Sequence, residues 1–234
     1  MNRRQYLFLS TGAAIGSLVA TEATRAQAPA ANQYSASGLS TGELKPLRHT
    51  EVPGFLSAGQ IAPHHSAHYG GALRAFMNVQ NEFDKSFEAG TPIKGPAFDR
   101  MKQLQSSRGN SVLLHELYFD GLALKRTDVP ETIRNAVANR FGSLEKWAVD
   151  FVDSARTAAG WAMLVVHPVN GKLYNVVSDE HAQGPLWLSA PLVVIDVYEH
   201  AFYIDYENRK GDYVDTFLDF IDWEEADRRY RQAV

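Results

Sequence analysis

Asp196 and His200 are the first residues whose types and spacing indicate chemistry. They lie four residues apart, and the apolar residues 192–195 directly before them are typical of a buried strand. A carboxylate oxygen together with imidazole nitrogens suits Fe, Mn or Zn, and the chain has no cysteine that could supply a thiolate. Such a pair is common by chance. Histidines in two earlier segments, however, can complete a metal site with it.

Those earlier histidines fall on two expected helices. Apolar residues recur with helical spacing over residues 57–83 and again over 97–124, and a Gly-Thr-Pro turn lies between the two stretches. The pattern predicts two long helices that are joined by a loop and form an antiparallel hairpin. His64 and His68 lie on the first helix, and His115 lies on the second.

The histidines of the first helix allow two interpretations. His64 and His68 are one helical turn apart and share a face, so a zinc-type His-x-x-x-His pair is an alternative. His65 lies about 100° round the same helix and is expected to be structural or exposed to solvent. The chain has no His-Glu-x-x-His pattern to place a general base beside a zinc ion, which argues against a zinc hydrolase.

The second half of the chain mixes helices with strands. The other predicted elements are strands at 161–166, 172–177 and 192–195 and helices at 130–141, 144–155, 212–221 and 223–231. Asn170-Gly171 is a turn dipeptide between the first two strands. We therefore expect an α+β fold, in which a long N-terminal antiparallel α-hairpin over residues 51–127 precedes an α/β lobe over residues 128–234 with a three-stranded antiparallel sheet.

The N-terminus has the features of an export signal. Arg3-Arg4 precedes a short apolar stretch, and Ala26-Gln27-Ala28 fits a small-residue cleavage site. We expect residues 1–28 to be a twin-arginine signal peptide that directs the protein to the periplasm. A permanent membrane anchor is the weaker alternative, because the stretch is shorter than the roughly 18 to 20 residues that span a bilayer. No stable membrane insertion is expected after processing, and residues 29–50 are expected to form a flexible leader.

Composition limits the classes of protein. Removal of residues 1–28 takes away three arginines and one glutamate, so the formal charge changes from −4 to −6. An acidic chain without an obvious basic face does not favour binding to nucleic acid. The absence of cysteine excludes disulfides, so burial of the 45% hydrophobic residues must stabilise the fold.

Four segments, in the same order, resemble the iron/manganese superoxide dismutase family. His64-His-Ser-Ala-His68 is similar to the histidine-rich helix of that family, and Leu114-His-Glu-Leu-Tyr-Phe119 is similar in outline to its Asn-His-x-Phe-Tyr-Trp segment. Gly160-Trp-Ala162 is similar to its glycine-tryptophan strand. Asp196-Val-Tyr-Glu-His-Ala-Phe-Tyr203 resembles its Asp-x-Trp-Glu-His-Ala-Tyr-Tyr signature. The resemblance covers residues 45–233.

The resemblance assigns roles to particular residues. It implies one Fe or Mn ion per subunit, with a solvent molecule as the fifth ligand, held by His64, His115, Asp196 and His200. It also implies that the substrate is superoxide, which is disproportionated to dioxygen and hydrogen peroxide. His68 matches a histidine that helps form the substrate channel, and Tyr203 matches the tyrosine that this histidine meets from the partner subunit. Glu199 matches a glutamate that crosses to the ligand histidine of the other subunit, so a homodimer or higher homo-oligomer is expected.

The residues around these ligands depart from the family pattern. The channel tyrosine of the family falls on Ala72, and the glutamine that holds the solvent falls either on Ser111 or in the stretch that contains His181 and Gln183. His181 or Gln183 is expected to reach the solvent. Dismutation requires a metal potential that is tuned between two half-reactions. The alternative is therefore a catalytically weak or inactive metal-binding protein of the same fold.

Overall fold

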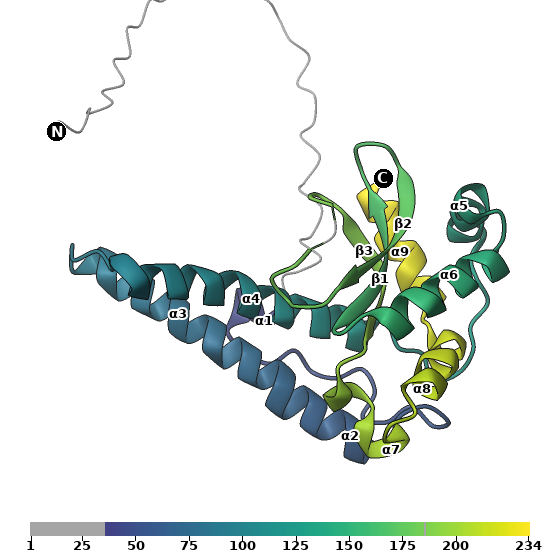
Figure 1. The fold of residues 1–234 in the computed structure, drawn as a ribbon, viewed down its shortest axis with the longest axis horizontal. Coiled ribbons are helices and arrows are strands. Elements are labelled where there is room, and N and C mark those ends of the chain that lie inside the picture. The colour runs from purple at the N-terminus through teal and green to yellow at the C-terminus, as the bar shows by residue number, and fades with distance from the viewer. Residues whose placement is uncertain (1–35, 185) are drawn as a thin grey trace, which may run out of the picture. The chain divides into compact units, whose positions relative to one another are not determined.

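The computed structural model describes residues 36–184 and 186–234, and these belong to one compact unit. The predicted signal peptide and the first part of the predicted leader lie outside the described residues. The predicted α+β fold is confirmed, because a helical hairpin precedes a three-stranded antiparallel sheet that is surrounded by further helices (Figure 1). Within the described residues, no helix has both the length and the apolar character that a membrane span requires.

The described chain begins with a segment that packs against the hairpin. Helix α1 (Gly38–Thr41) starts after Ser37, whose side chain accepts a hydrogen bond from the amide of Leu39. The amide of Gly38 donates to the carboxylate of Glu116 at 2.8 Å, inside the protein. From Ser37 onward the chain therefore does not form the flexible leader that the sequence predicts. The reason is a buried hydrogen-bond acceptor that lies 78 residues further along the chain.

The helical hairpin carries two of the predicted ligands. Its first arm consists of α2 (Ala58–Pro63), a π-helical segment (His64–Tyr69) and α3 (Gly70–Glu88), and its second arm is α4 (Gly95–Asp120). Helices α3 and α4 lie side by side (Figure 1). Helical periodicity predicts both arms but not the π-helical segment. Such segments widen one turn of a helix and are frequent at functional sites.

The sheet has the strand order β2-β1-β3, and β1 is antiparallel to both neighbours. The strands are β1 (Trp161–His167), β2 (Lys172–Ser178) and β3 (Ala190–Asp196). Each contains the corresponding predicted strand; β1 and β2 extend it by one residue and β3 by three. Because β1 is the central strand and is covered on both faces, it is apolar along nearly its whole length. The register places Trp161 opposite Asp196, so the start of β1 lies beside the expected metal ligand.

Helices enclose the sheet. They are α5 (Glu131–Phe141), α6 (Leu144–Thr157), α7 (Tyr203–Tyr206), α8 (Lys210–Phe217) and α9 (Trp223–Ala233), with 3-10 turns at Glu199–Ala201 and Leu218–Phe220. Helices α4 and α9 pack against β3, and α6 packs against β1. The side chains of Trp147, Phe151 and Trp161 are almost completely buried between these layers. This packing fixes the end of β3, where Asp196 lies.

Gly160, directly before β1, lies where the chain is tightly packed. A Cβ atom at this position would lie 2.7 Å from the carbonyl oxygen of Ser178 and 2.9 Å from the phenol of Tyr198. We expect Gly160→Ala to lower the free energy of unfolding by about 1–3 kcal/mol, because the paired backbone of β2 cannot move away freely. Urea unfolding measures this. Gly184→Ala is the matched control, since nothing lies within 4 Å of the added carbon. Equal unfolding midpoints for the two variants would contradict the prediction.

Candidate metal centre

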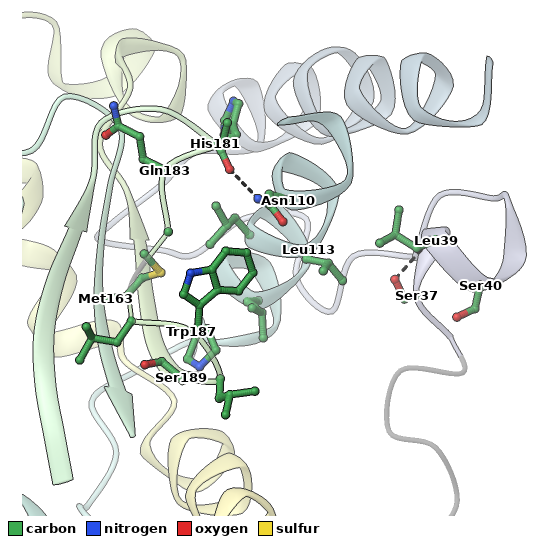
Figure 2. A pocket seen from close by; sticks show the side chains of 17 residues that line it. Ser37, Leu39, Ser40, Asn110, Leu113, Met163, His181, Gln183, Trp187 and Ser189 are labelled. Atoms are coloured by element: carbon green, nitrogen blue, oxygen red, sulfur yellow. Dashed lines mark hydrogen bonds between the residues drawn. The ribbon is translucent and has the colours of Figure 1, made fainter. Parts of the chain in front are cut away.

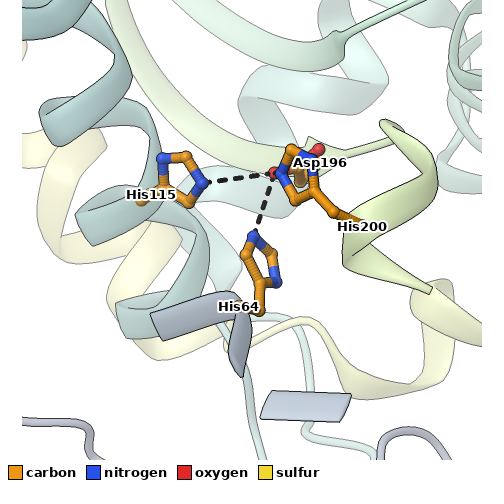
Figure 3. A group of neighbouring side chains, drawn as sticks. All are labelled: His64, His115, Asp196 and His200. Atoms are coloured by element: carbon orange, nitrogen blue, oxygen red, sulfur yellow. Dashed lines mark hydrogen bonds and ion pairs between the residues drawn. The ribbon is translucent and has the colours of Figure 1, made fainter. Parts of the chain in front are cut away.

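The four predicted ligands converge from four different segments (Figure 3). His64 comes from the π-helical segment, His115 from α4, Asp196 from the end of β3 and His200 from the 3-10 turn that follows. One ligand atom of each lies within 4.8 Å of all the others. The structure thus brings together residues that are up to 136 positions apart in the sequence.

The distances fit a single metal ion. The Nε2 atoms of His64, His200 and His115 lie 3.1, 3.3 and 3.7 Å from Oδ2 of Asp196. Ligand atoms about 2.1 Å from one ion, at angles of about 90 to 125°, are roughly 3.0 to 3.7 Å apart. Nε2 of His115 and Nε2 of His200 are buried and have no hydrogen-bond partner. An ion at this point satisfies both nitrogens.

Hydrogen bonds from the surrounding backbone orient two of the ligands. Nδ1 of His115 donates to the carbonyl oxygen of Ser111 at 2.7 Å, which leaves Nε2 of the neutral ring free to bind a metal. The amide of Tyr198 donates to Oδ1 of Asp196 at 3.0 Å, so that Oδ2 faces the histidines. The hydroxyl of Tyr213 donates to the carbonyl oxygen of Asp196 at 2.8 Å. Hydrogen bonds therefore fix both the carboxylate and the backbone carbonyl of Asp196.

Gln60 is a supporting residue that the sequence analysis missed. Its Nε2 donates to the carbonyl oxygen of His200 at 2.7 Å, and its Oε1 accepts from the amide of Ile204 at 3.0 Å. The side chain is completely buried. Gln60 lies four residues before His64 on the same helical face, and that spacing is the signal that could have identified it. It ties the turn that bears His200 to the helix that leads into His64.

Burial sets the protonation states of the ligands. It lowers the pKa of His115 to about 3 and lowers the pKa of His64 as well. Burial alone would raise the pKa of Asp196, but the close imidazoles of His200 and His64 lower it overall. The neutral imidazoles and the ionised carboxylate give a ligand set with one negative charge. Hard nitrogen and oxygen donors of this kind suit a divalent or trivalent Fe or Mn ion.

His68 lies outside the ligand cluster. Its ring stacks on that of His200, with centroids 3.8 Å apart and an angle of 8° between the planes, and its side chain is exposed. The rings of His64 and His68 are 6.2 Å apart and almost perpendicular. His68 is not among the four residues whose ligand atoms converge, so the cluster does not contain the alternative zinc pair of His64 and His68. His65 is not part of the ligand cluster. Its Nε2 donates to the carbonyl oxygen of Lys45 at 2.8 Å, which agrees with its predicted structural role.

The loop after β2 brings His181 next to the cluster. Nδ1 of His181 accepts a hydrogen bond from the indole nitrogen of Trp161 at 3.0 Å, and the ring centroid lies 6.3 Å from that of His115. Asn110 on α4 donates to the carbonyl oxygen of His181 at 2.8 Å (Figure 2). Gln183 instead uses its Oε1 to accept from the amide of Asp179 in its own loop. Of the two candidates, His181 lies beside the ligands.

A cavity of about 630 Å³ lies on the other side of this loop, between α4 and the residues that lead into β3 (Figure 2). Its lining is mostly apolar and includes Leu113, Met163 and Trp187, together with His181. None of the four ligands lines it. The metal centre and this cavity are therefore separate features. His181 lies beside the ligands and also lines the cavity.

The three imidazoles and one carboxylate, held between a helical hairpin and an antiparallel sheet, define a mononuclear metal-binding protein with an α+β fold. Residues 129–229 match the family of iron/manganese superoxide dismutases, C-terminal domain. The chain is 33% identical over 199 residues to superoxide dismutase (Mn) 1 of Haloferax volcanii, a match that covers 84% of this chain and 98% of the relative.

Relatives with either metal in their names are similar to this chain. It is 30% identical over 197 residues to the superoxide dismutase (Fe) of Cupriavidus metallidurans, covering 82% of this chain and 98% of the relative. It is 31% identical over 183 residues to the superoxide dismutase (Fe) of Aquifex aeolicus, covering 76% and 86%. The chain belongs to the iron/manganese superoxide dismutase family.

The metal-free protein is expected to lose stability in acid through His115. The unfolded chain binds a proton at this residue below about pH 6.5, whereas the folded chain does so only near pH 3. The unfolded state therefore binds more protons between these values, and the free energy of unfolding falls as the pH falls, by at most about 1.4 kcal/mol per pH unit from this group. Urea unfolding at several pH values should show a shallower dependence in His115→Gln. An unchanged slope would contradict the assignment.

Proposed function

We propose that this protein is a superoxide dismutase that converts superoxide to dioxygen and hydrogen peroxide with one Fe or Mn ion per subunit. The observation that carries the proposal is the buried convergence of His64, His115 and His200 on the carboxylate of Asp196. Membership of the family supports it. The ligand chemistry, which lacks sulfur, is equally compatible with Fe and Mn.

The reaction consumes two superoxide anions and two protons. One superoxide loses an electron and leaves as dioxygen, and the other gains that electron and both protons and leaves as hydrogen peroxide. A bound Fe or Mn ion, held by His64, His115, Asp196 and His200, would supply the one-electron chemistry. The chain contributes the fixed ligand geometry and hydrogen-bond donors beside it. Protons must come from such donors or from solvent.

His181 is the donor that the geometry favours. An indole N–H can only donate, so Nδ1 of His181 accepts from Trp161 and the neutral ring carries its proton on Nε2. Burial lowers the pKa of His181, which keeps the ring neutral near pH 7. The Nε2–H group is then available to hold a solvent molecule or superoxide at the metal centre. In this role His181 replaces the glutamine of the family pattern.

A homodimer is part of the proposal. Glu199, Tyr203 and Ile204 lie on the turn and short helix around His200, and all three are exposed. The exposed fractions of Tyr203 and Ile204 are 51% and 59%, which is high for large side chains beside a buried site. A second subunit on this face would cover them and place Glu199 near the ligand histidine of its partner. His68, which stacks on His200, lies on the same face.

Export to the periplasm is also part of the proposal. It rests on Arg3-Arg4, the short apolar stretch and Ala26-Gln27-Ala28, which lie outside the described residues. The twin-arginine route carries folded proteins. A site whose ligands come from four segments needs a folded chain before it can bind its ion, so this route would suit metal binding before export.

A catalytically weak metal-binding protein remains the second candidate. Two observations favour it: Ala72 is buried and offers only a methyl group where the family has a tyrosine, and Ser111 supports His115 through its backbone carbonyl. Both changes leave the four ligands in place. The two candidates therefore differ in turnover and agree on metal binding.

Metal content and superoxide removal together test the proposed activity. We expect the purified protein to hold about one Fe or Mn ion per chain by mass spectrometry, and to remove superoxide faster than the same amount of free ion. His200→Ala should lose both the ion and the activity, because the site loses one of four ligands. His167→Ala, at the end of β1 and outside the cluster, is the matched control.

Two results would contradict the proposal in different ways. Stoichiometric metal with no removal above that of the free ion would favour the weakly active candidate. Full metal content in His200→Ala would show that the ligand assignment is wrong.

The homodimer makes a separate prediction for Glu199. Sedimentation velocity should show a dimer, and Glu199→Ala should raise the dimer dissociation constant by at least about tenfold, because a charge-assisted hydrogen bond across the interface is lost. Glu88→Ala, at the far end of α3, should leave the dissociation constant unchanged. A monomeric wild-type protein at micromolar concentration would remove this part of the proposal.

A further inference from the structure

A buried hydrogen-bond network lies behind the metal centre and joins three segments of the chain. The hydroxyl of Tyr69 and the amide of Gly38 both donate to Oε1 of Glu116, each at 2.8 Å. The amide of Lys45 donates to the hydroxyl oxygen of Tyr69 at 2.9 Å. The carbonyl oxygen of Lys45 accepts from His65 at 2.8 Å. The segment from residue 37 to residue 45 is thus bonded to both arms of the hairpin.

The network reaches the ligands through their nearest neighbours. Glu116 directly follows the ligand His115 on α4, and Tyr69 and His65 belong to the π-helical segment that bears the ligand His64. The ring of Tyr69 also packs against the imidazole of His115, with centroids 6.2 Å apart and an angle of 29° between the planes. The bond between Tyr69 and Glu116 therefore links the two helical segments that must hold their histidines at one ion.

The residues of this network are buried, so water cannot replace a hydrogen bond that is lost. Tyr69 is 1% exposed and Glu116 is 6% exposed. A carboxylate so placed is costly unless donors satisfy it, and loss of either donor leaves Oε1 of Glu116 with one of its two hydrogen bonds. Burial raises the pKa of Tyr69, so the phenol stays protonated and acts as a donor to Glu116. Full satisfaction of the Glu116 carboxylate therefore needs both the phenol of Tyr69 and the amide of Gly38.

We propose that Tyr69 and Glu116 are positioning residues for the metal centre, and that docking of residues 37–45 is coupled to metal binding. The inference rests on the proposed metal site. A segment that fixes the spacing of two ligand-bearing helices raises the affinity for the ion, and by reciprocity the bound ion strengthens docking of the segment. The N-terminal segment thereby becomes part of the metal site without contributing a ligand.

Hydrogen exchange of the wild-type protein tests the coupling directly. The amides of Gly38 and Lys45 donate to Glu116 and Tyr69 and report on docking of the segment. Loading with Mn²⁺ should slow exchange at both amides relative to the metal-free protein. Unchanged exchange at these amides on loading would overturn the inference while leaving the metal site intact. Failure to bind Mn²⁺ or Fe²⁺ at all would overturn both the inference and the proposed function.

Conservative variants test the positioning role. Tyr69→Phe and Glu116→Gln keep the shape of the side chain, and each should weaken Mn²⁺ binding about tenfold in a chelator competition. In both variants, loading should no longer slow exchange at Gly38. Tyr174→Phe is the matched control, because it removes a phenol that accepts from Asn170 on the surface of the sheet. Wild-type affinity in both variants would overturn the positioning role.

Discussion

The carboxylate of Asp196 is the constraint on which the rest of the structure depends. It is completely buried, and a buried charge is strongly destabilising unless partners compensate it. The imidazoles of His64 and His115, from distant segments, and of the nearby His200 surround it, and a bound Fe or Mn ion would complete the compensation. The strand that ends in Asp196 is held by its register with β1, by Tyr198 and by Tyr213. The fold therefore brings the Nε2 atoms of three histidines close to Oδ2 of Asp196.

The same sheet register links Asp196 to His181, the residue that we propose as a hydrogen-bond donor at the metal centre. Trp161 pairs with Asp196 across the two strands, and its indole fixes His181. A shift of β1 by one residue would therefore move Trp161 out of register with Asp196 and away from His181. Where the family has a tyrosine and a glutamine this chain has Ala72 and Ser111, and we propose that His181, from the loop after β2, takes the place of the glutamine. We expect the metal potential to be set by this rearranged environment.

Much of this arrangement could be predicted from the sequence. The sequence patterns around the ligands are strong, because His64 and His115 lie on helices with regular apolar spacing and Asp196 ends an apolar strand. The docking of residues 37–45 could not be predicted, because its cause is Glu116, a residue far away whose burial no local pattern shows. The π-helical segment was missed for a related reason. Its widened turn is stabilised by tertiary contacts, whereas periodicity reports only the average helix.

X-ray absorption of the Fe-loaded or Mn-loaded protein tests the central claim most directly, because it reports the atoms around the ion without reference to activity. Three imidazole nitrogens together with one carboxylate oxygen, at about 2.0–2.2 Å, are the expected protein ligands. The multiple scattering of imidazole rings should be present in the wild-type protein and weaker in His64→Ala. A shell made of oxygen atoms alone, or one that His64→Ala leaves unchanged, would contradict the convergence of the three histidines on Asp196 around one ion.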